Sequence, residues 1–108
     1  MLFDHRTYKC RPGALQNHVK LYEEFGRAPQ TRHLGEPLAW LITETGELNT
    51  FVHIWGYRDA ADRAARRAAM QADPEWQEFL RRSAEAGYLV EQRTQLMTAA
   101  PFMRLPGQ

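Results

Sequence analysis

Two short segments carry side chains whose types and spacing could do chemistry together. His53, Trp55 and Tyr57 occupy alternating positions, so on a strand they share one face. Arg6 and Tyr8 alternate in the same way near the amino terminus. Guanidinium and phenol groups hold oxygen atoms, and an imidazole can move a proton near neutral pH. We therefore predict a site for a small, partly aromatic or carbonyl-bearing molecule. Its candidate catalytic residue is His53, and its candidate ligand-binding residues are Arg6, Tyr8, Trp55 and Tyr57.

The same five residues have a second interpretation, as a structural hydrogen-bonding network across two strands. Alternation alone does not establish that both strands turn these side chains toward one space. Two functions therefore stay open. The first is an enzyme or binding protein for a small organic molecule, and the second is a non-enzymatic protein-interaction or scaffold domain.

Other site chemistries lack support in the sequence. The single cysteine, Cys10, rules out an intrachain disulfide and a cysteine-based zinc site, and no histidine pair has metal-site spacing. The only serine, Ser83, lies in a helical segment outside any nucleophile elbow, and there is no phosphate-binding loop. We expect no metal and no cofactor.

The net charge and the length of the chain limit the kinds of partner that it can bind. The 108 residues carry a net charge of +1, so we expect no nucleic-acid binding. The longest uncharged apolar run spans residues 38–42, and no leader segment is recognisable, so we expect no membrane binding and a cytoplasmic location. A chain of this size forms one domain with a core, and we expect no deep pocket within one protomer.

Seven elements must position the site. Residues 2–10 form a strand, and the apolar spacing of Leu15, Val19, Tyr22 and Phe25 predicts a helix that kinks or breaks at Gly26 and Pro29. Residues 38–45 and 50–57 form an antiparallel hairpin. Residues 59–70 and 73–86 form capped helices, and residues 88–98 form the last strand. We interpret the three arginines of the first capped helix, at positions 63, 66 and 67, as a charged outer face, with binding of an acidic partner or ligand as the alternative.

This order, βαββαβ, predicts an α+β, ferredoxin-like domain with a four-stranded antiparallel sheet. Helices would cover one face of that sheet and leave the other bare. A second copy is the simplest cover, so we expect a homodimer joined sheet to sheet. We assign residues 1–108 to one domain, with residues 99–108 as a tail that packs on the domain or on its partner.

Motifs along nearly the whole chain, about residues 2–103, resemble the NIPSNAP family. They comprise an acidic-x-Arg-x-Tyr strand before Pro-Gly, an Arg-His-x-Gly segment, Gly-x-Leu-Asn before a His-x-Trp-x-Tyr strand, and Asp-Pro-Glu-Trp. In this chain these are Asp4, Arg6, Tyr8, Pro12 and Gly13; Arg32, His33 and Gly35; Gly46, Leu48, Asn49, His53, Trp55 and Tyr57; and residues 73–76. The resemblance implies a dimeric α/β barrel but no particular reaction, because related barrels include cofactor-free oxygenases, haem-degrading enzymes and isomerases.

Overall fold

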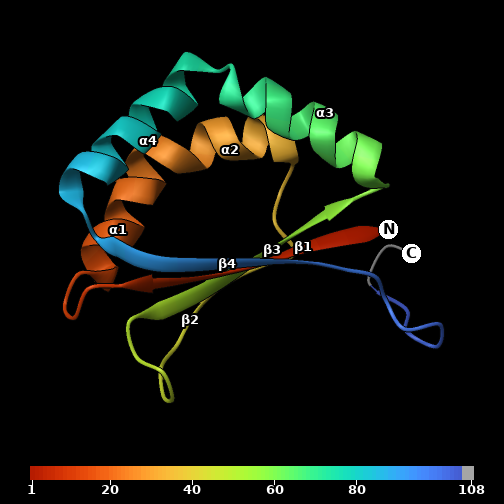
Figure 1. The fold of residues 1–108 in the computed structure, drawn as a ribbon, viewed down its shortest axis with the longest axis horizontal. Helices are drawn as coiled ribbons and strands as arrows, with labels where there is room; N and C mark the ends of the chain where they lie inside the picture. The colour runs from red at the N-terminus through yellow and green to blue at the C-terminus, as the bar shows by residue number, and fades with distance from the viewer. Residues whose placement is uncertain (106–108) are drawn as a thin grey trace.

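The fold is a four-stranded antiparallel sheet with all its helices on one side (Figure 1). This computed structural model describes residues 1–105. The strands are β1 (Leu2–Cys10), β2 (Ala39–Ile42), β3 (Thr50–Tyr57) and β4 (Leu89–Met97), in the order β2-β3-β1-β4. The helices are α1 (Leu15–Leu21), the π-helical η1 (Tyr22–Gly26), α2 (Arg27–Leu34), α3 (Ala60–Gln71) and α4 (Pro74–Ala86). The predicted α+β, ferredoxin-like architecture is confirmed.

The hairpin is shorter than expected on its first strand. β2 spans four residues, whereas the sequence predicted a strand over residues 38–45. Single backbone hydrogen bonds extend the ladder by one residue at each end, from the Leu38 N–H to the Ile54 carbonyl and from the Thr43 N–H to the Thr50 carbonyl. The turn residues that follow Thr43 then curve away from β3.

The first helical segment does not break at Gly26 or Pro29; of the predicted kink or break, the structure shows a local irregularity that ends at Gly26. Helical structure runs from Leu15 to Leu34, and the irregularity is the π-helical turn η1. A π turn admits one extra residue into a helix and changes its direction. Pro29 follows in the first turn of α2, where a proline is tolerated. Gly26 is needed for packing, because a Cβ there would lie 2.8 Å from Tyr22 Cδ1 and 3.0 Å from Phe79 Cδ1.

The caps of the last two helices follow the sequence prediction. Asp59 Oδ1 accepts the Asp62 N–H at 2.8 Å, and Asp62 Oδ2 accepts the Arg58 N–H at 3.0 Å, so both carboxylates cap the start of α3. Asp73 Oδ1 accepts the Glu75 N–H at 2.9 Å at the start of α4. Gly87 ends α4 in the left-handed region, with φ of 65°. These local bonds fix where both helices begin and end.

Strand register decides which side chains share a face. Arg6 lies opposite His53, Tyr8 lies opposite Phe51, and on the far side of β3 Trp40 also pairs with His53. Paired residues of neighbouring strands point to the same side of a sheet. The two candidate segments therefore do face one space, and it is the space under the helices.

The opposite face of the sheet carries no helix (Figure 1). Leu41 and Met97 on this face are 59% and 47% exposed, and Phe102 in the segment after β4 is 86% exposed. The described part of the tail thus leaves its largest apolar side chain unpacked within the protomer, and residues 106–108 of the predicted tail lie outside the described residues. No helix within residues 1–105 is long and apolar enough to cross a bilayer.

Candidate functional site

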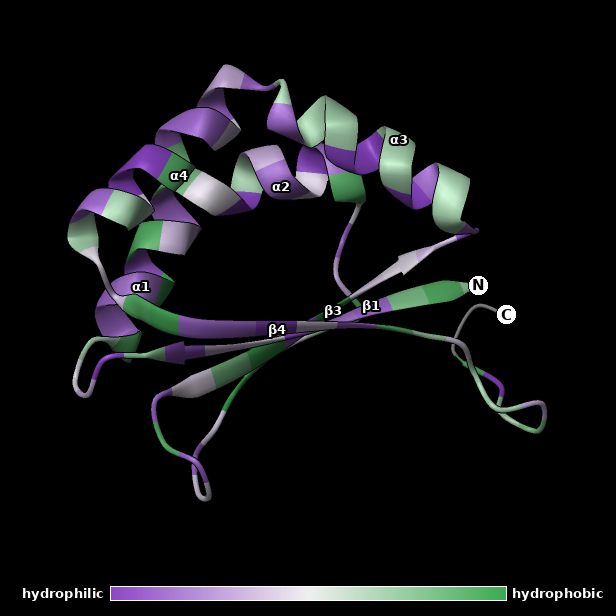
Figure 2. Cartoon of the chain, in the orientation of Figure 1, coloured by the Kyte–Doolittle hydropathy of each residue, from purple (hydrophilic) through white to green (hydrophobic). Residues whose placement is uncertain are grey.

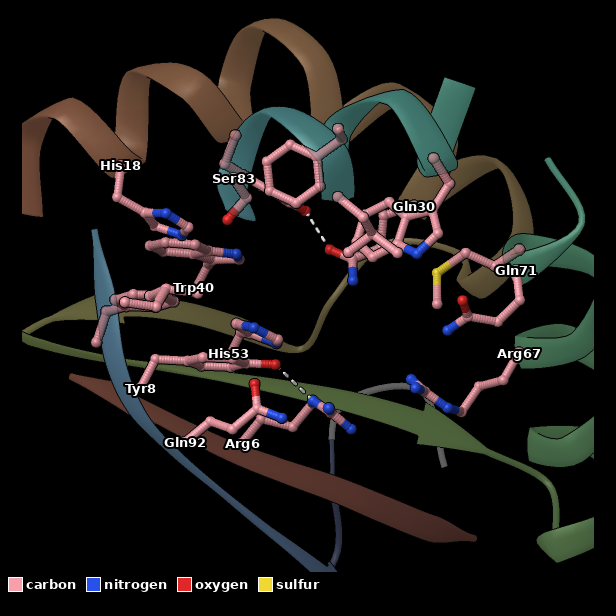
Figure 3. Close-up of a pocket in the computed structure, with 17 residues that line it drawn as sticks. Arg6, Tyr8, His18, Gln30, Trp40, His53, Arg67, Gln71, Ser83 and Gln92 are labelled. Carbon is pink, nitrogen blue, oxygen red and sulfur yellow. Dashed lines mark hydrogen bonds between the residues drawn. The ribbon is translucent and has the colours of Figure 1, made fainter. Parts of the chain in front are cut away.

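A cavity of about 230 Å³ lies between the sheet and the helices of a single protomer (Figure 3). The expectation that a chain this small holds no such pocket is wrong, because the helices arch over the sheet without filling the space above its centre. The polar lining residues are Arg6, Tyr8, His18, Gln30, His53, Arg67, Gln71, Ser83 and Gln92. The aromatic lining residues include Tyr22, Trp40, Phe51, Trp76 and Phe79.

One wall of the cavity is a charged network on β1. The Arg6 Nε–H donates to the Tyr8 hydroxyl oxygen at 2.9 Å, and the other end of Arg6 lies 3.4 Å from Asp4 Oδ1. Asp4 is fully buried and also accepts a hydrogen bond from Arg63 Nε at 3.0 Å. Burial opposes the positive charge of Arg6, but Tyr8 and Asp4 outweigh it, so the pKa of Arg6 is raised. Because the Tyr8 oxygen already accepts a bond, its own O–H can donate to a ligand.

The imidazole of His53 is held neutral and in one tautomer. Trp55 Nε1, which can only donate, gives its hydrogen to His53 Nδ1 at 2.5 Å. The ring therefore carries its proton on Nε2. Burial, and then the positive charge of Arg6, lower the pKa of His53 to about 3. At neutral pH His53 thus offers the cavity a hydrogen-bond donor rather than a free base.

Two further buried groups on the helix side have unused hydrogen-bonding capacity. His18 Nδ1 and Trp76 Nε1 have no hydrogen-bond partner among the described residues, although the two side chains are only 3% and 6% exposed. Burial lowers the pKa of His18 to about 4, so its ring is also neutral. Unpaired buried polar groups are costly, and their presence around a cavity marks a place for a ligand or water.

Gln30 orients a third group toward the same space. The Tyr22 hydroxyl donates to Gln30 Oε1 at 2.6 Å, and burial raises the pKa of that hydroxyl. With its oxygen engaged, the Gln30 amide has its N–H groups left to donate. Figure 3 shows Gln30 above the cavity, between the helices and His53.

The floor of the cavity is a stack of flat rings. Tyr8 and Phe51 lie 4.9 Å apart with planes 5° from parallel, and Trp40 and Phe51 lie 4.7 Å apart at 6°. Each ring comes from a different strand, so the sheet register creates this surface. Rings stacked face to face present their edges to the cavity, and an aromatic ring of a ligand can place its face against such edges.

Arg67 projects into the cavity from α3 (Figure 3). The interpretation of the three α3 arginines as an outer face is therefore wrong for two of them. Arg63 turns inward to Asp4, and only Arg66 stays outside, paired with Asp62 at 2.9 Å. Arg67 has no ion-pair partner within residues 1–105. A guanidinium without a carboxylate partner beside a cavity is a binding group for an anion.

The five residues singled out in the sequence divide into two sets. Arg6, Tyr8 and His53 line the cavity. Trp55 and Tyr57 share their sheet face but are 0% and 1% exposed and do not line it, so the structure does not support direct ligand contact for either. Trp55 instead fixes the tautomer of His53, and burial, followed by the nearby charge of Asp4, raises the pKa of Tyr57.

Several residues that line the cavity were not selected from the sequence. For some of them, the spacing of neighbouring residues indicates an inward-facing side chain. Arg67 recurs at helical spacing with Arg63 and the fully buried Met70, which predicts an inward face. His18 lies three residues after Leu15 and four before Tyr22, within the apolar stripe rather than beside it. Gln92 carried no such signal. No group of three His, Cys, Asp or Glu within residues 1–105 is placed to hold a metal ion.

Two relatives found by sequence similarity are NipSnap homologues. The chain is 30% identical over 78 residues to human Protein NipSnap homolog 3A, covering 72% of this chain and 31% of that protein. It is 34% identical over 74 residues to the Protein NipSnap homolog of Dictyostelium discoideum, covering 68% of this chain and 32% of that protein. The chain thus spans about a third of the length of these relatives.

Solved structures agree with the fold. Protein Atu4242 from Agrobacterium tumefaciens superimposes with a TM-score of 0.90 at 35% identity, over 97% of this chain and 99% of that one. A protein solved as an antibiotic biosynthesis monooxygenase matches with a TM-score of 0.62 at 21% identity, over 94% of this chain and 100% of that one, which shows a shared fold only. The NIPSNAP family model matches residues 3–104. On this evidence, the chain belongs to the NIPSNAP family.

Proposed function

We propose that this protein binds a small organic molecule in the cavity between its sheet and its helices. The observation that carries the proposal is that polar groups with unused hydrogen-bonding capacity line one pocket. His18 and Trp76 come from the helices and are unpaired. His53 comes from the sheet and has Nδ1 engaged by Trp55, which leaves Nε2 to donate. A concave site with an apolar wall and a few oriented polar groups is typical of ligand pockets. Figure 3 shows His18 on the helix side and His53 on the sheet side of this space.

The chemistry that the site supports best is stabilisation of a negatively charged oxygen. Neutral His53 donates from Nε2, and Arg6 stands beside it on the neighbouring strand. A neutral imidazole of lowered pKa polarises a carbonyl without giving up its proton. A cofactor-free oxygenase-like or isomerase-like reaction would use this to stabilise an enolate, with His53 as an electrophile rather than as a general base.

We further propose that the working unit is a homodimer joined through the open sheet face. Leu41, Met97 and Phe102 leave apolar surface exposed on or beside that face, whereas the middle of β4 is hydrophilic (Figure 2). Light scattering at micromolar concentration tests this proposal. A mass near twice 12.6 kDa is expected, and a mass near 12.6 kDa would contradict it.

A pair of substitutions on α4 tests whether the cavity is the binding site. Ser83→Leu places a larger side chain in the cavity, whereas Ala84→Leu adds a larger side chain on the exposed side of the same helix. Native mass spectrometry of the protein as purified, and after incubation with a panel of small acids, ketones and phenols, measures bound mass.

We expect added mass on the wild-type protein and on Ala84→Leu, and none on Ser83→Leu. Added mass that persists in Ser83→Leu would place binding elsewhere. Absence of binding across the whole panel would favour the scaffold function, in which the same residues act as structural hydrogen bonders.

A further inference from the structure

The cavity has an excess of positive charge at one end. Arg6 and Arg67 line it, and among residues 1–105 no aspartate or glutamate does. Asp4 lies behind Arg6 and is shared with Arg63, so three guanidinium groups face one carboxylate in this region. Three positive groups and one negative group leave a net charge of +2, which a bound anion would reduce.

Several uncharged groups around the cavity are also donors. The indole of Trp76 can only donate, and His53 donates from Nε2 because Nδ1 is occupied. The Tyr8 hydroxyl and the Gln30 amide already accept one bond each, which turns their hydrogens toward other partners. A ligand that satisfies such a lining must be rich in acceptor atoms.

The shape of the cavity limits the class of ligand further. The stacked rings of Tyr8, Phe51 and Trp40 present their edges to the cavity, and Arg67 reaches in from α3 toward the side of the cavity where Arg6 lies (Figure 3). A molecule that satisfies both features has a planar ring system and an anionic oxygen group at one end.

We propose that the ligand is an aromatic carboxylate, whose carboxylate lies beside Arg67 and whose ring packs against the edges of the stacked Tyr8, Phe51 and Trp40 rings. This inference rests on the proposed function, since it names the class of molecule that the cavity takes. It makes Arg67, which lines the cavity without an ion-pair partner within residues 1–105, a specificity-determining residue.

Matched pairs of an aromatic carboxylate and its amide separate the effect of the negative charge on binding from the effect of the ring. Benzoate against benzamide and 2-naphthoate against 2-naphthamide differ in charge but hardly in shape. Two of the three tryptophans, Trp40 and Trp76, line the cavity, so quenching of intrinsic fluorescence reports occupancy. Titrations use the full-length protein, Arg67→Gln, and Arg66→Gln as the control, because Arg66 lies next in sequence but pairs with Asp62 outside the cavity.

Wild type and Arg66→Gln are expected to bind at least one carboxylate about ten- to a hundredfold more tightly than its amide, the range for a hydrogen bond to a charged group. Arg67→Gln is expected to remove most of that preference while still binding the amide. Equal affinity for acid and amide would overturn this inference and leave the proposed function standing. A preference that survives in Arg67→Gln would also overturn it. Binding of neither ligand in any pair would overturn both proposals.

Discussion

The buried imidazole of His53 should make this protein less stable in mild acid. Its pKa is lowered to about 3 in the folded chain, first by burial and then by Arg6, against an ordinary value of 6.5. Below pH 6.5, His53 therefore binds a proton in the unfolded chain but stays unprotonated in the folded chain. This contribution to stability is fully present above pH 6.5 and is lost as pH falls from 6.5 toward 3.

The size of the loss follows from the same shift. Within that window, each unit by which the pH falls lowers the free energy of unfolding by about 1.4 kcal/mol for each histidine that is protonated only in the unfolded chain. Between pH 7 and pH 5, His53 alone accounts for a fall of about 2 kcal/mol in the free energy of unfolding. His18, whose pKa is lowered to about 4, acts in the same direction and adds to it.

Urea unfolding at pH 7, 6 and 5, at one protein concentration, measures the effect. His53→Gln cannot titrate, so its loss between pH 7 and 5 is expected to be smaller than that of the wild type by about 2 kcal/mol. His5→Gln, on the opposite sheet face, leaves His53 in place and should retain the His53 component. Equal losses in wild type and His53→Gln would refute the claim that burial holds this ring neutral.

The tautomer offers an independent check of the same reasoning. Nitrogen NMR of the labelled protein should show His53 at pH 7 with its proton on Nε2. Trp55→Phe removes the indole donor that engages Nδ1, so the fixed tautomer should give way to a mixture. A ring protonated on Nδ1 in the wild type would contradict the assignment.

Two further substitutions test how the site is supported, both by urea unfolding. Asp4→Asn leaves two buried guanidinium groups without their carboxylate and should cost about 3–5 kcal/mol, whereas Glu85→Gln, in an exposed ion pair, should stay within about 0.5 kcal/mol of wild type. Gly26→Ala places a Cβ against Tyr22 and Phe79 and should lower the free energy of unfolding by about 1–3 kcal/mol. An unchanged free energy of unfolding would mean that the π-helical turn can shift to accommodate the methyl group at no cost.

Sequence alone determined the elements and their order, because their signals are local. Capping by Asp59 and Asp73 depends on residues two or three positions away, and strand alternation depends on every second residue. The sequence predicted a kink or break at Gly26 but not its form, the π-helical turn Tyr22–Gly26. Gly26 leaves no room for a Cβ beside Phe79, which is distant in sequence.

Only the tertiary structure decided which of these residues form a site. The pairing of Arg6 with His53 joins strands 47 positions apart, and a shift of one residue in that register would have turned one set to the opposite face. The inward turn of Arg67 depends on how α3 sits over the sheet, and the neutral state of His53 depends on its burial beneath the helices. A sequence lists the groups that can do chemistry, but long-range packing sets their shared space, their protonation and their partners.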